Sequence, residues 1–200
     1  MAVPPTSPSR SELRSVARAA RAAFVASLDE STRRRLTAGL AVRLAPLLVG
    51  RQRIAGYAAM RDEIDPASTN FTLWPRVVGD DRPLAFHAVA AAELVAAPGW
   101  GPREPNGDAP VAIPDAVLVP LLAADLRGYR LGYGKGHYDR TLHGLDALRV
   151  GVAWDCQIVE HVPDEAWDEP LDWLVTPTRT IRCNGGRCDR TGVGAQALVG

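Results

Sequence analysis

A glycine-rich segment over residues 130–139 carries the groups that phosphate binding requires. Its sequence is Arg-Leu-Gly-Tyr-Gly-Lys-Gly-His-Tyr-Asp, with glycine at three alternate positions. These glycines let the backbone approach a ligand closely, and the unpaired amides of the helix start expected behind them favour a phosphate. Lys135 adds a full positive charge, Arg130 precedes the glycines, and Asp139 in the first helical turn can hold the Mg²⁺ that accompanies a nucleotide. The segment therefore predicts a nucleotide phosphate site.

The segment matches neither standard nucleotide fingerprint. A Walker loop would have Ser or Thr after its lysine, but Gly136 follows Lys135, and a dinucleotide-binding loop would have glycine at the position of His137. A glycine-rich turn between a strand and a helix, without a ligand, is the alternative that the spacing leaves open.

Lys135 is the only lysine in the chain, since the other 22 of its 23 basic residues are arginine. A composition that uses arginine everywhere else and keeps an ammonium group at one position indicates that a compact point charge is required there. Chance is the alternative explanation.

The composition of the 200-residue chain, with 46% apolar and 23% charged residues, is that of a globular protein. The 23 basic and 23 acidic side chains cancel, which argues against a partner that is nucleic acid or a membrane surface. The sequence shows neither an export signal nor an apolar run of membrane-spanning length. We therefore expect a cytoplasmic protein, and we expect it to be a monomer.

Three cysteines are too few for a disulfide scaffold. Cys183 and Cys188 have no second pair of ligands nearby, so a zinc site is not expected. Cys156 follows an apolar run and is predicted to be a small buried residue. His87 and His143 are expected to have packing or surface roles.

Two helices are expected to lead the chain. Ser9 and Glu12 have the spacing of a capping box, and apolar residues recur behind them every three or four positions, which predicts a helix over 9–28. A second stripe on this helix consists of Arg10, Arg14, Arg18 and Arg21, and it forms either a solvated face or a binding face. A second helix is expected over 31–45, ended by Pro46.

Short apolar runs alternate with irregular or helical connections after residue 50. Strands are expected at 53–59, 83–89, 115–119, 149–154 and 172–176. Short helices are expected to begin at Asp65-Pro66 and to cover 90–97 and 135–145. This alternation predicts an α/β domain on a largely parallel sheet.

One catalytic domain is expected over residues 9–183, between a loose N-terminal tail, 1–8, and a flexible C-terminal tail, 184–200. The stretch 98–114 contains several prolines and glycines, which predicts an irregular loop. Loops of this length inside a domain often serve function.

Four segments, in order, resemble the 5-formyltetrahydrofolate cyclo-ligase family, also called methenyltetrahydrofolate synthetases. They are residues 10–14, 57–65, 100–105 with the strand ending at 119–120, and 130–139, and the likeness extends over Arg10 to Thr176. It implies a three-layer αβα fold with a largely parallel or mixed sheet, of the type found in sugar-phosphate isomerases and coenzyme A transferases.

The resemblance also implies a reaction. ATP and Mg²⁺ would drive 5-formyltetrahydrofolate to 5,10-methenyltetrahydrofolate, with release of ADP and phosphate. The formyl oxygen is a poor leaving group, so it would first become a phosphorylated imidate and would then leave as phosphate when the second folate nitrogen closes the ring. The alternatives are a noncatalytic nucleotide-binding regulatory module and a relative that uses ATP on another heterocycle.

Roles for individual residues follow from the same resemblance. Catalysis is assigned to Lys135 and Arg130, which would stabilise charge on the transferring phosphoryl group. The nucleotide would be bound by Arg10, Arg14, Arg130, Gly132, Tyr133, Gly134, Lys135, Gly136 and Tyr138. The reduced folate would be bound by Glu63, Met60, Trp100, Tyr133 and His137. Magnesium would be held by Asp139 and Asp168.

Some positions depart from the family pattern. Arg10 stands where lysine is common, and His137 stands where an aromatic ring is usual. The region 66–82 follows the family only loosely. Arg18 and Arg21 receive no role from the resemblance and are taken as surface residues.

Overall fold

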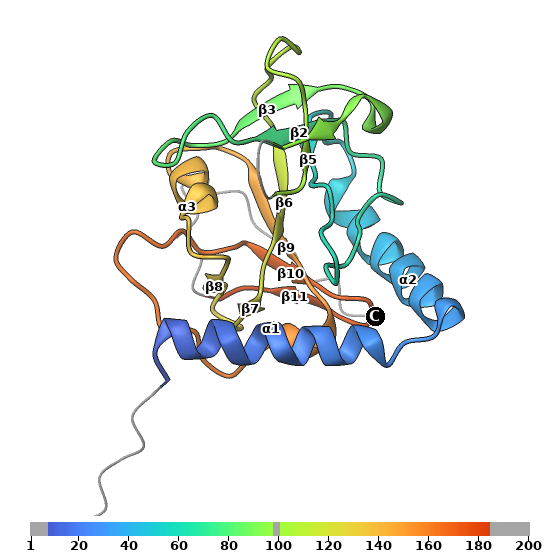
Figure 1. Cartoon of the computed structure of the whole chain (residues 1–200), viewed down its shortest axis with the longest axis vertical. Coiled ribbons are helices and arrows are strands. Elements are labelled where there is room, and N and C mark those ends of the chain that lie inside the picture. The colour runs from blue at the N-terminus through green and yellow to red at the C-terminus, as the bar shows by residue number, and fades with distance from the viewer. Residues whose placement is uncertain (1–7, 98–100, 185–200) are drawn as a thin grey trace, which may run out of the picture.

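A seven-stranded mixed sheet forms the centre of the computed structural model, which describes residues 8–97 and 101–184 (Figure 1). The strands are β1 (Ile54–Ala55), β2 (Leu73–Arg76), β3 (Ala85–Ala88), β6 (Ala116–Pro120), β9 (Leu148–Val152), β10 (Trp173–Val175) and β11 (Thr180–Arg182). Their order is β11-β10-β9-β6-β1-β2-β3. The inner neighbours pair in parallel, whereas β3 and β11 close the two edges in antiparallel pairs.

Helices and two small hairpins surround this sheet. The α-helices are α1 (Arg10–Ala26), α2 (Glu30–Leu48) and α3 (His137–Leu142), and the 3-10 turns are η1 (Ala91–Glu93) and η2 (Asp155–Gln157). The hairpins pair β4 (Val95–Ala96) with β5 (Arg103–Glu104) and β7 (Ala123–Ala124) with β8 (Arg130–Leu131).

Alternation along β6 divides the core into two layers. Ala116 and Leu118 belong to a buried cluster with Leu40 and Leu44 of α2. Their neighbours Val117 and Val119 belong to a second cluster, which contains Leu142 of α3. Because successive side chains of a strand point to opposite faces, α2 covers one face and α3 the other. The αβα fold class is thus confirmed.

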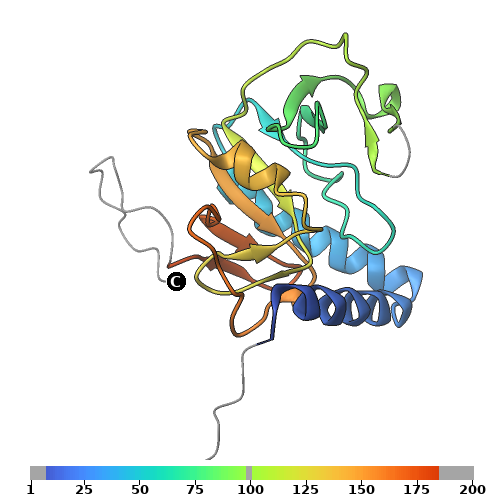
Figure 2. The ribbon, with the colours of Figure 1, turned by 60° about the vertical axis from the view of Figure 1, so that its left-hand side comes forward.

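Helix α1 lies across the end of the sheet instead of covering a face (Figures 1 and 2). It contacts η2, which follows β9, and β7, which follows β6. Both elements lie beyond carboxyl ends of parallel strands. Strand β1 lies between β2, which follows it in sequence, and β6, which is added later on the opposite side of β1. The strand order therefore reverses at β1. Ligands of open α/β sheets bind outside the carboxyl ends at such a switch point, which is the edge that α1 borders.

The capping box predicted for the first helix is confirmed, whereas the second helix extends past its predicted end. The side chain of Ser9 accepts a hydrogen bond from the amide of Glu12, and Glu12 completes the capping box. Helix α2 continues through Pro46 to Leu48, so the prediction that proline ends it is wrong. Pro46 removes one backbone donor, but it is exposed and in the last turn, where the remaining helix contacts tolerate the loss.

Several local predictions need correction. Asp65 and Pro66 form a turn and no helix: the Asp65 carboxylate accepts from the amide of Ala67, and the Pro66 carbonyl accepts from Thr69. The span 90–97 contains only the short turn η1 before β4, and the helix expected over 135–145 is limited to α3.

The strand predictions recover β1, β3, β6, β9 and β10, but they miss the inner strand β2 and the strands of two or three residues outside these spans. The expected strand 53–59 contains only the two residues of β1, while 115–119 agrees closely with β6. Strands β2, β7, β8 and β11 were not expected, and β5 lies within the span predicted to be irregular. Trp100 and Cys188 lie outside the described residues, as do 1–7 and 185–200 of the expected tails.

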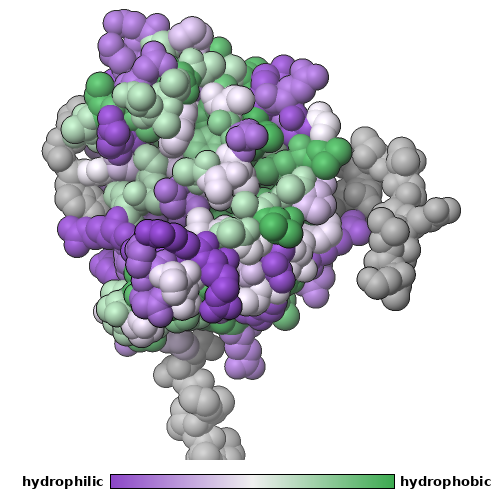
Figure 3. Space-filling model, turned by 90° about the vertical axis from the view of Figure 1, so that its right-hand side faces the viewer, coloured by the Kyte–Doolittle hydropathy of each residue, from purple (hydrophilic) through white to green (hydrophobic). Residues whose placement is uncertain are grey.

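The surface shows no large segregation of residue types on the face drawn in Figure 3, where hydrophilic and hydrophobic residues are mixed. None of the helices within the described ranges combines the length and the apolarity needed to cross a bilayer. Cys156 is exposed, which corrects its prediction as a buried residue, because η2 turns it away from the core.

Asp125 organises the hairpin that leads into the glycine-rich segment. Its carboxylate is fully buried and accepts hydrogen bonds from the amides of Arg127, Tyr129 and Val162 and from the Arg127 guanidinium. We expect Asp125→Ala to lower the free energy of unfolding by about 3–5 kcal/mol, because it leaves buried partners unpaired. Urea unfolding measures this loss. Asp164→Ala, which removes a more exposed partner of Arg127, serves as control and should cost less than about 1 kcal/mol; equal losses would contradict the assigned role of Asp125.

Candidate active site

The glycine-rich segment connects β8 to α3 and leaves space beside its backbone. Gly134 and Gly136 have φ angles of 95° and 66°, in the left-handed region that other residues rarely adopt. A Cβ placed on Gly132 would have no neighbouring atom within 4 Å. Gly136 is the N-cap of α3. The segment therefore has the open, glycine-dependent backbone that the sequence predicted.

Helix α1 contacts this segment through Arg14. The Nε of Arg14 donates to the carbonyl of Gly132 at 3.2 Å, and its guanidinium lies near Gly134. Lys135 extends into solvent, with 71% of its side chain exposed, and its Nζ is 4.0 Å from Oδ1 of Asp80. Arg14 thus contacts the backbone of the glycine-rich loop directly. Lys135 is a solvent-exposed side chain of the same loop, with Asp80 as its acidic neighbour.

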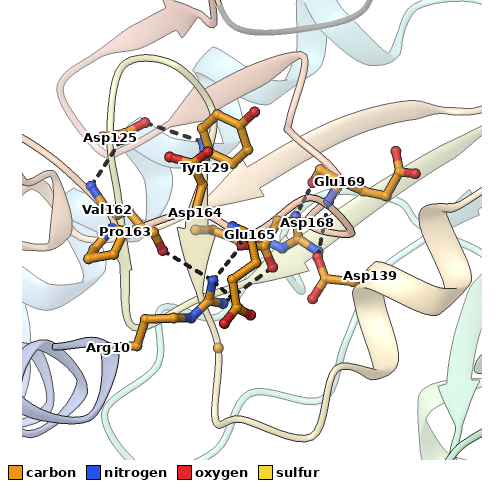
Figure 4. A network of polar contacts seen from close by, with 12 residues as sticks. Arg10, Asp125, Tyr129, Asp139, Val162, Pro163, Asp164, Glu165, Asp168 and Glu169 are labelled. Carbon is orange, nitrogen blue, oxygen red and sulfur yellow. Dashed lines mark hydrogen bonds and ion pairs between the residues drawn. The ribbon is translucent and has the colours of Figure 1, made fainter.

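Two arginine–aspartate pairs lie close to the loop, and Arg10, Asp168 and Asp139 of these pairs are labelled in Figure 4. Arg10 donates from both terminal nitrogens to the carboxylate of Asp168 and also donates to the carbonyl of Pro163. Arg130 donates from Nη2 to Oδ1 of Asp139 at 2.8 Å. The structure thus brings together four of the residues that the resemblance assigned to nucleotide and magnesium.

The segment after Asp168 joins the two pairs. The carbonyl of Glu169 accepts from Arg130, and its amide donates to Oδ1 of Asp139 at 3.3 Å. Burial lowers the pKa of Arg130, although the charges of Asp139 and Asp168 oppose that effect. Burial alone would lower the pKa of Arg10 as well, but its contacts with Asp168 raise it.

The carboxylates of these pairs are the groups that could contact magnesium. Among the described residues, Arg130 and the amide of Glu169 both donate to Oδ1 of Asp139. Within residues 8–97 and 101–184, no cluster of three His, Cys, Asp or Glu side chains is arranged to hold a metal ion. A Mg²⁺ ion here would therefore need phosphate oxygens and water to complete its coordination, as is usual for Mg²⁺ bound with a nucleotide.

A second polar cluster surrounds Glu63 at the switch point. Glu63 is 5% exposed; its Oε2 accepts from the amide of Met60 at 2.9 Å, and its Oε1 accepts from the hydroxyl of Tyr133 at 3.0 Å. Arg21 of α1 donates to the Tyr133 oxygen at 2.8 Å and to Oδ1 of Asp62 at 3.0 Å. The cluster joins the loop after β1, helix α1 and the glycine-rich segment.

Burial raises the pKa of Glu63, while its hydrogen bonds from Met60 and Tyr133 and the charge of Arg21 oppose the rise. Burial also raises the pKa of Tyr133, with a contribution from the charge of Glu63. A buried carboxylate next to neutral hydroxyl groups is suited to accept hydrogen bonds from an uncharged ring edge.

The remaining predicted site residues are distributed differently. Met60 supplies a backbone amide to Glu63, and Tyr138 packs against the core below the loop. His137 does not join the Glu63 cluster through a described hydrogen bond: its Nδ1 lies 3.4 Å from the carbonyl of Arg82. Trp100, outside the described residues, cannot be placed.

Sequence reasoning missed Arg21, which it treated as a surface residue. Its side chain is 2% exposed. The signal was available, because Arg21 follows Ala17 by four positions and precedes Phe24 by three, which places it on the apolar stripe of the helix. Asp62 and Trp154 were missed as neighbours of the site, where the indole of Trp154 donates to the Asp62 carbonyl at 2.9 Å.

Comparison with known proteins agrees with the family resemblance seen in the sequence. A family model described as the 5-formyltetrahydrofolate cyclo-ligase family matches residues 6–177. The chain is 45% identical over 84 residues to the 5-formyltetrahydrofolate cyclo-ligase of Escherichia coli K12, an alignment that covers 38% of this chain and 46% of that protein. It is 37% identical over 113 residues to the cyclo-ligase of Mycolicibacterium smegmatis, covering 52% and 56% respectively. The matches thus span about half the length of these curated relatives.

The similarity to a solved structure extends further. The NMR structure of Aquifex aeolicus 5,10-methenyltetrahydrofolate synthetase aligns with a TM-score of 0.72 and 32% identity, covering 92% of this chain and 97% of that one. A synthetase from Mycoplasma pneumoniae, at 21% identity and a TM-score of 0.65, shares the fold.

Proposed function

Since the chain belongs to the 5-formyltetrahydrofolate cyclo-ligase family, we propose that it converts 5-formyltetrahydrofolate to 5,10-methenyltetrahydrofolate and that ATP becomes ADP and phosphate. The observation that carries this proposal is that one loop borders both polar clusters. Arg14 contacts Gly132 on the arginine side, and Tyr133, the next residue, contacts Glu63 on the other. A phosphate tail and a ring that bind to these two sides would meet at the loop.

The chemistry requires orientation and charge neutralisation. The formyl oxygen attacks the terminal phosphorus, and the bond from that phosphorus to ADP breaks. The second folate nitrogen then adds to the activated carbon and loses its proton, and the carbon–oxygen bond breaks to release phosphate. Phosphoryl transfer leaves the protein little covalent work, so its contribution is to align the two substrates and stabilise developing negative charge.

We assign the nucleotide to the arginine side of the loop. Arg10, Arg14 and Arg130 supply positive charge there, and the open space beside Gly132 admits a phosphate. Lys135 is long and exposed enough to reach the terminal phosphoryl group, whose charge it would neutralise. Asp139 and Asp168 would hold the Mg²⁺ that accompanies the nucleotide. Mg²⁺ supplies charge neutralisation of the nucleotide.

We assign the reduced folate to the Glu63 side. The pterin ring has an N–H and an amino group along one edge, and the two oxygens of Glu63 match such a pair of donors. Met60 and Tyr133 hold these oxygens through one hydrogen bond each. The ring would then lie at the carboxyl edge of the sheet, where α1 closes the switch point.

An absorbance assay tests the proposal directly. Purified protein with ATP, Mg²⁺ and 5-formyltetrahydrofolate should produce the methenyl product, which absorbs in the near ultraviolet, and ADP should accumulate in equal amount. A folded protein that binds ATP but gives no product would instead be a noncatalytic nucleotide-binding module. A screen of other heterocycles would identify a relative with a different substrate.

Two further expectations belong to this proposal. We place the activity in the cytoplasm and expect the protein to act as a monomer. Light scattering on the purified protein measures the mass. A dimer whose dissociation abolishes activity would contradict the second expectation.

A further inference from the structure

Arg21 is a buried cation on a helix face that otherwise packs against apolar side chains. It is 2% exposed, and Ala17, one turn before it, is buried against Leu122 and Ala123. An arginine is rarely buried unless it is paired. Its terminal nitrogens donate to the carbonyl of Leu121 at 3.3 Å as well as to Asp62 and Tyr133. The guanidinium of Arg21 is therefore paired with three specific acceptors, on Leu121, Asp62 and Tyr133.

These contacts determine the direction of the hydrogen bond between Tyr133 and Glu63. A guanidinium only donates, so the Tyr133 oxygen must accept from Arg21. The single hydroxyl proton of Tyr133 is then left for its other neighbour, Oε1 of Glu63, at 3.0 Å. Arg21 thus acts on Glu63 through the tyrosine, and its Nη1 also lies 3.9 Å from Oε1.

We propose that Arg21 is a positioning residue for the reduced folate: it holds Tyr133 as a hydrogen-bond donor and, through Tyr133, holds the buried Glu63 carboxylate in place for the ring. This inference rests on the proposed function. With one hydrogen bond from Tyr133 at Oε1 and one from Met60 at Oε2, each carboxylate oxygen keeps acceptor capacity for the substrate.

Burial raises the pKa of Glu63, and the groups that oppose this rise are the hydrogen bonds from Met60 and Tyr133 and then the positive charge of Arg21. Asp62 adds negative charge from the same loop, and Tyr57 lies nearby on the strand side. Tyr133 and Tyr138 face it from the glycine-rich segment and α3. Arg21 is the cation that faces it from α1. Removing this cation would raise the pKa of Glu63 further, because burial and Asp62 would remain while the opposing charge is lost.

The experiment compares Arg21→Met with the parent protein in steady-state assays. We expect KM for 5-formyltetrahydrofolate to increase about 10- to 100-fold, the loss that corresponds to a charged hydrogen bond of about 1.5–3 kcal/mol. KM for ATP should change less than about twofold, since the arginine side of the loop is intact. The acid limb of the pH profile of kcat/KM for the folate should move to higher pH, so the defect shrinks as pH rises.

Three further variants separate positioning from a structural role. Arg21→Lys should recover part of the folate KM and of the pH profile, because it restores a buried donor and charge. Tyr133→Phe interrupts the link to Glu63 and should not add its full effect to that of Arg21→Met in the double variant. Arg34→Met removes an exposed arginine of α2 and should leave the kinetics unchanged.

The outcomes distinguish this inference from the proposed function. If the parent protein makes no methenyl product, the proposed function fails. If the parent is active and Arg21→Met folds with an unchanged pH profile, or raises both KM values equally, Arg21 is only structural. If Arg21→Met does not fold, Tyr133→Phe decides, because an unshifted folate KM and pH profile in that variant overturn the inference.

Discussion

Replacing Lys135 with alanine should lower kcat by about 10²–10³-fold, or roughly 2.7–4 kcal/mol of transition-state stabilisation, as observed when one electrostatic donor is lost from an active site. In the proposed function, the Lys135 ammonium is the compact charge that would neutralise the negative charge developing on the transferring phosphoryl group. Its side chain is 71% exposed and is not buried in the core, so the melting temperature should stay within about one degree. Single-turnover kinetics with saturating ATP and folate measure the effect on chemistry.

The neighbour of Lys135 provides a matched control. Asp80, 87% exposed, lies 4.0 Å from Nζ of Lys135. If the lysine serves only to hold Asp80, then Asp80→Asn should cost as much activity as Lys135→Ala. We expect Asp80→Asn to keep the parent kcat. Near-normal turnover of Lys135→Ala would remove the lysine from the mechanism.

Glu63→Gln should weaken binding of 5-formyltetrahydrofolate about 10- to 100-fold, because one acceptor of a charged hydrogen-bond pair becomes an amide donor. The amide nitrogen would face either the Met60 amide or the Tyr133 hydroxyl, each of which donates to Glu63 in the parent protein. One of these contacts, or one to the ring, is then lost. Calorimetry with the folate and, separately, with ATP measures both affinities.

The ATP measurement is the internal control for Glu63→Gln. Glu63 contacts the Tyr133 side of the loop and none of the three arginines assigned to phosphate, so ATP affinity should change by less than about twofold. Equal weakening of both ligands would indicate that the substitution disturbs the loop as a whole and would argue against a contact between Glu63 and the pterin.

The glycine-rich segment to which we assign the nucleotide could be identified from sequence because its residues are contiguous. The spacing and the residue types of Gly132 to Asp139 can be read within one segment of the sequence. The glycines also explain the backbone conformation of the segment. The capping box of α1 could be predicted for the same reason, since Ser9 and Glu12 are three residues apart. Arg10 and Asp168 were assigned to the site by the family resemblance, and their ion pair is visible only in the folded structure.

The features that local sequence patterns did not predict depend on contacts between distant parts of the chain. Arg21 looked like one member of a solvated arginine stripe, but its helix crosses the sheet's end, where Asp62 and Tyr133 face it. Pro46 is a helix breaker by propensity, yet α2 continues past it, since Leu44 before it is anchored in the core. Strand β2, with its proline, follows no clear alternation, and its pairing with β1 and β3 sustains it.

The ion pair between Arg10 and Asp168 joins residues that are 158 positions apart. During translation, Arg10 emerges from the ribosome with the first helix, while Asp168 follows only after most of the chain has been synthesised. The nascent polypeptide therefore carries Arg10 without this partner until 158 further residues have been synthesised. The site that we assign to the nucleotide is complete only when synthesis has passed residue 168, so ATP binding there would begin only after that point.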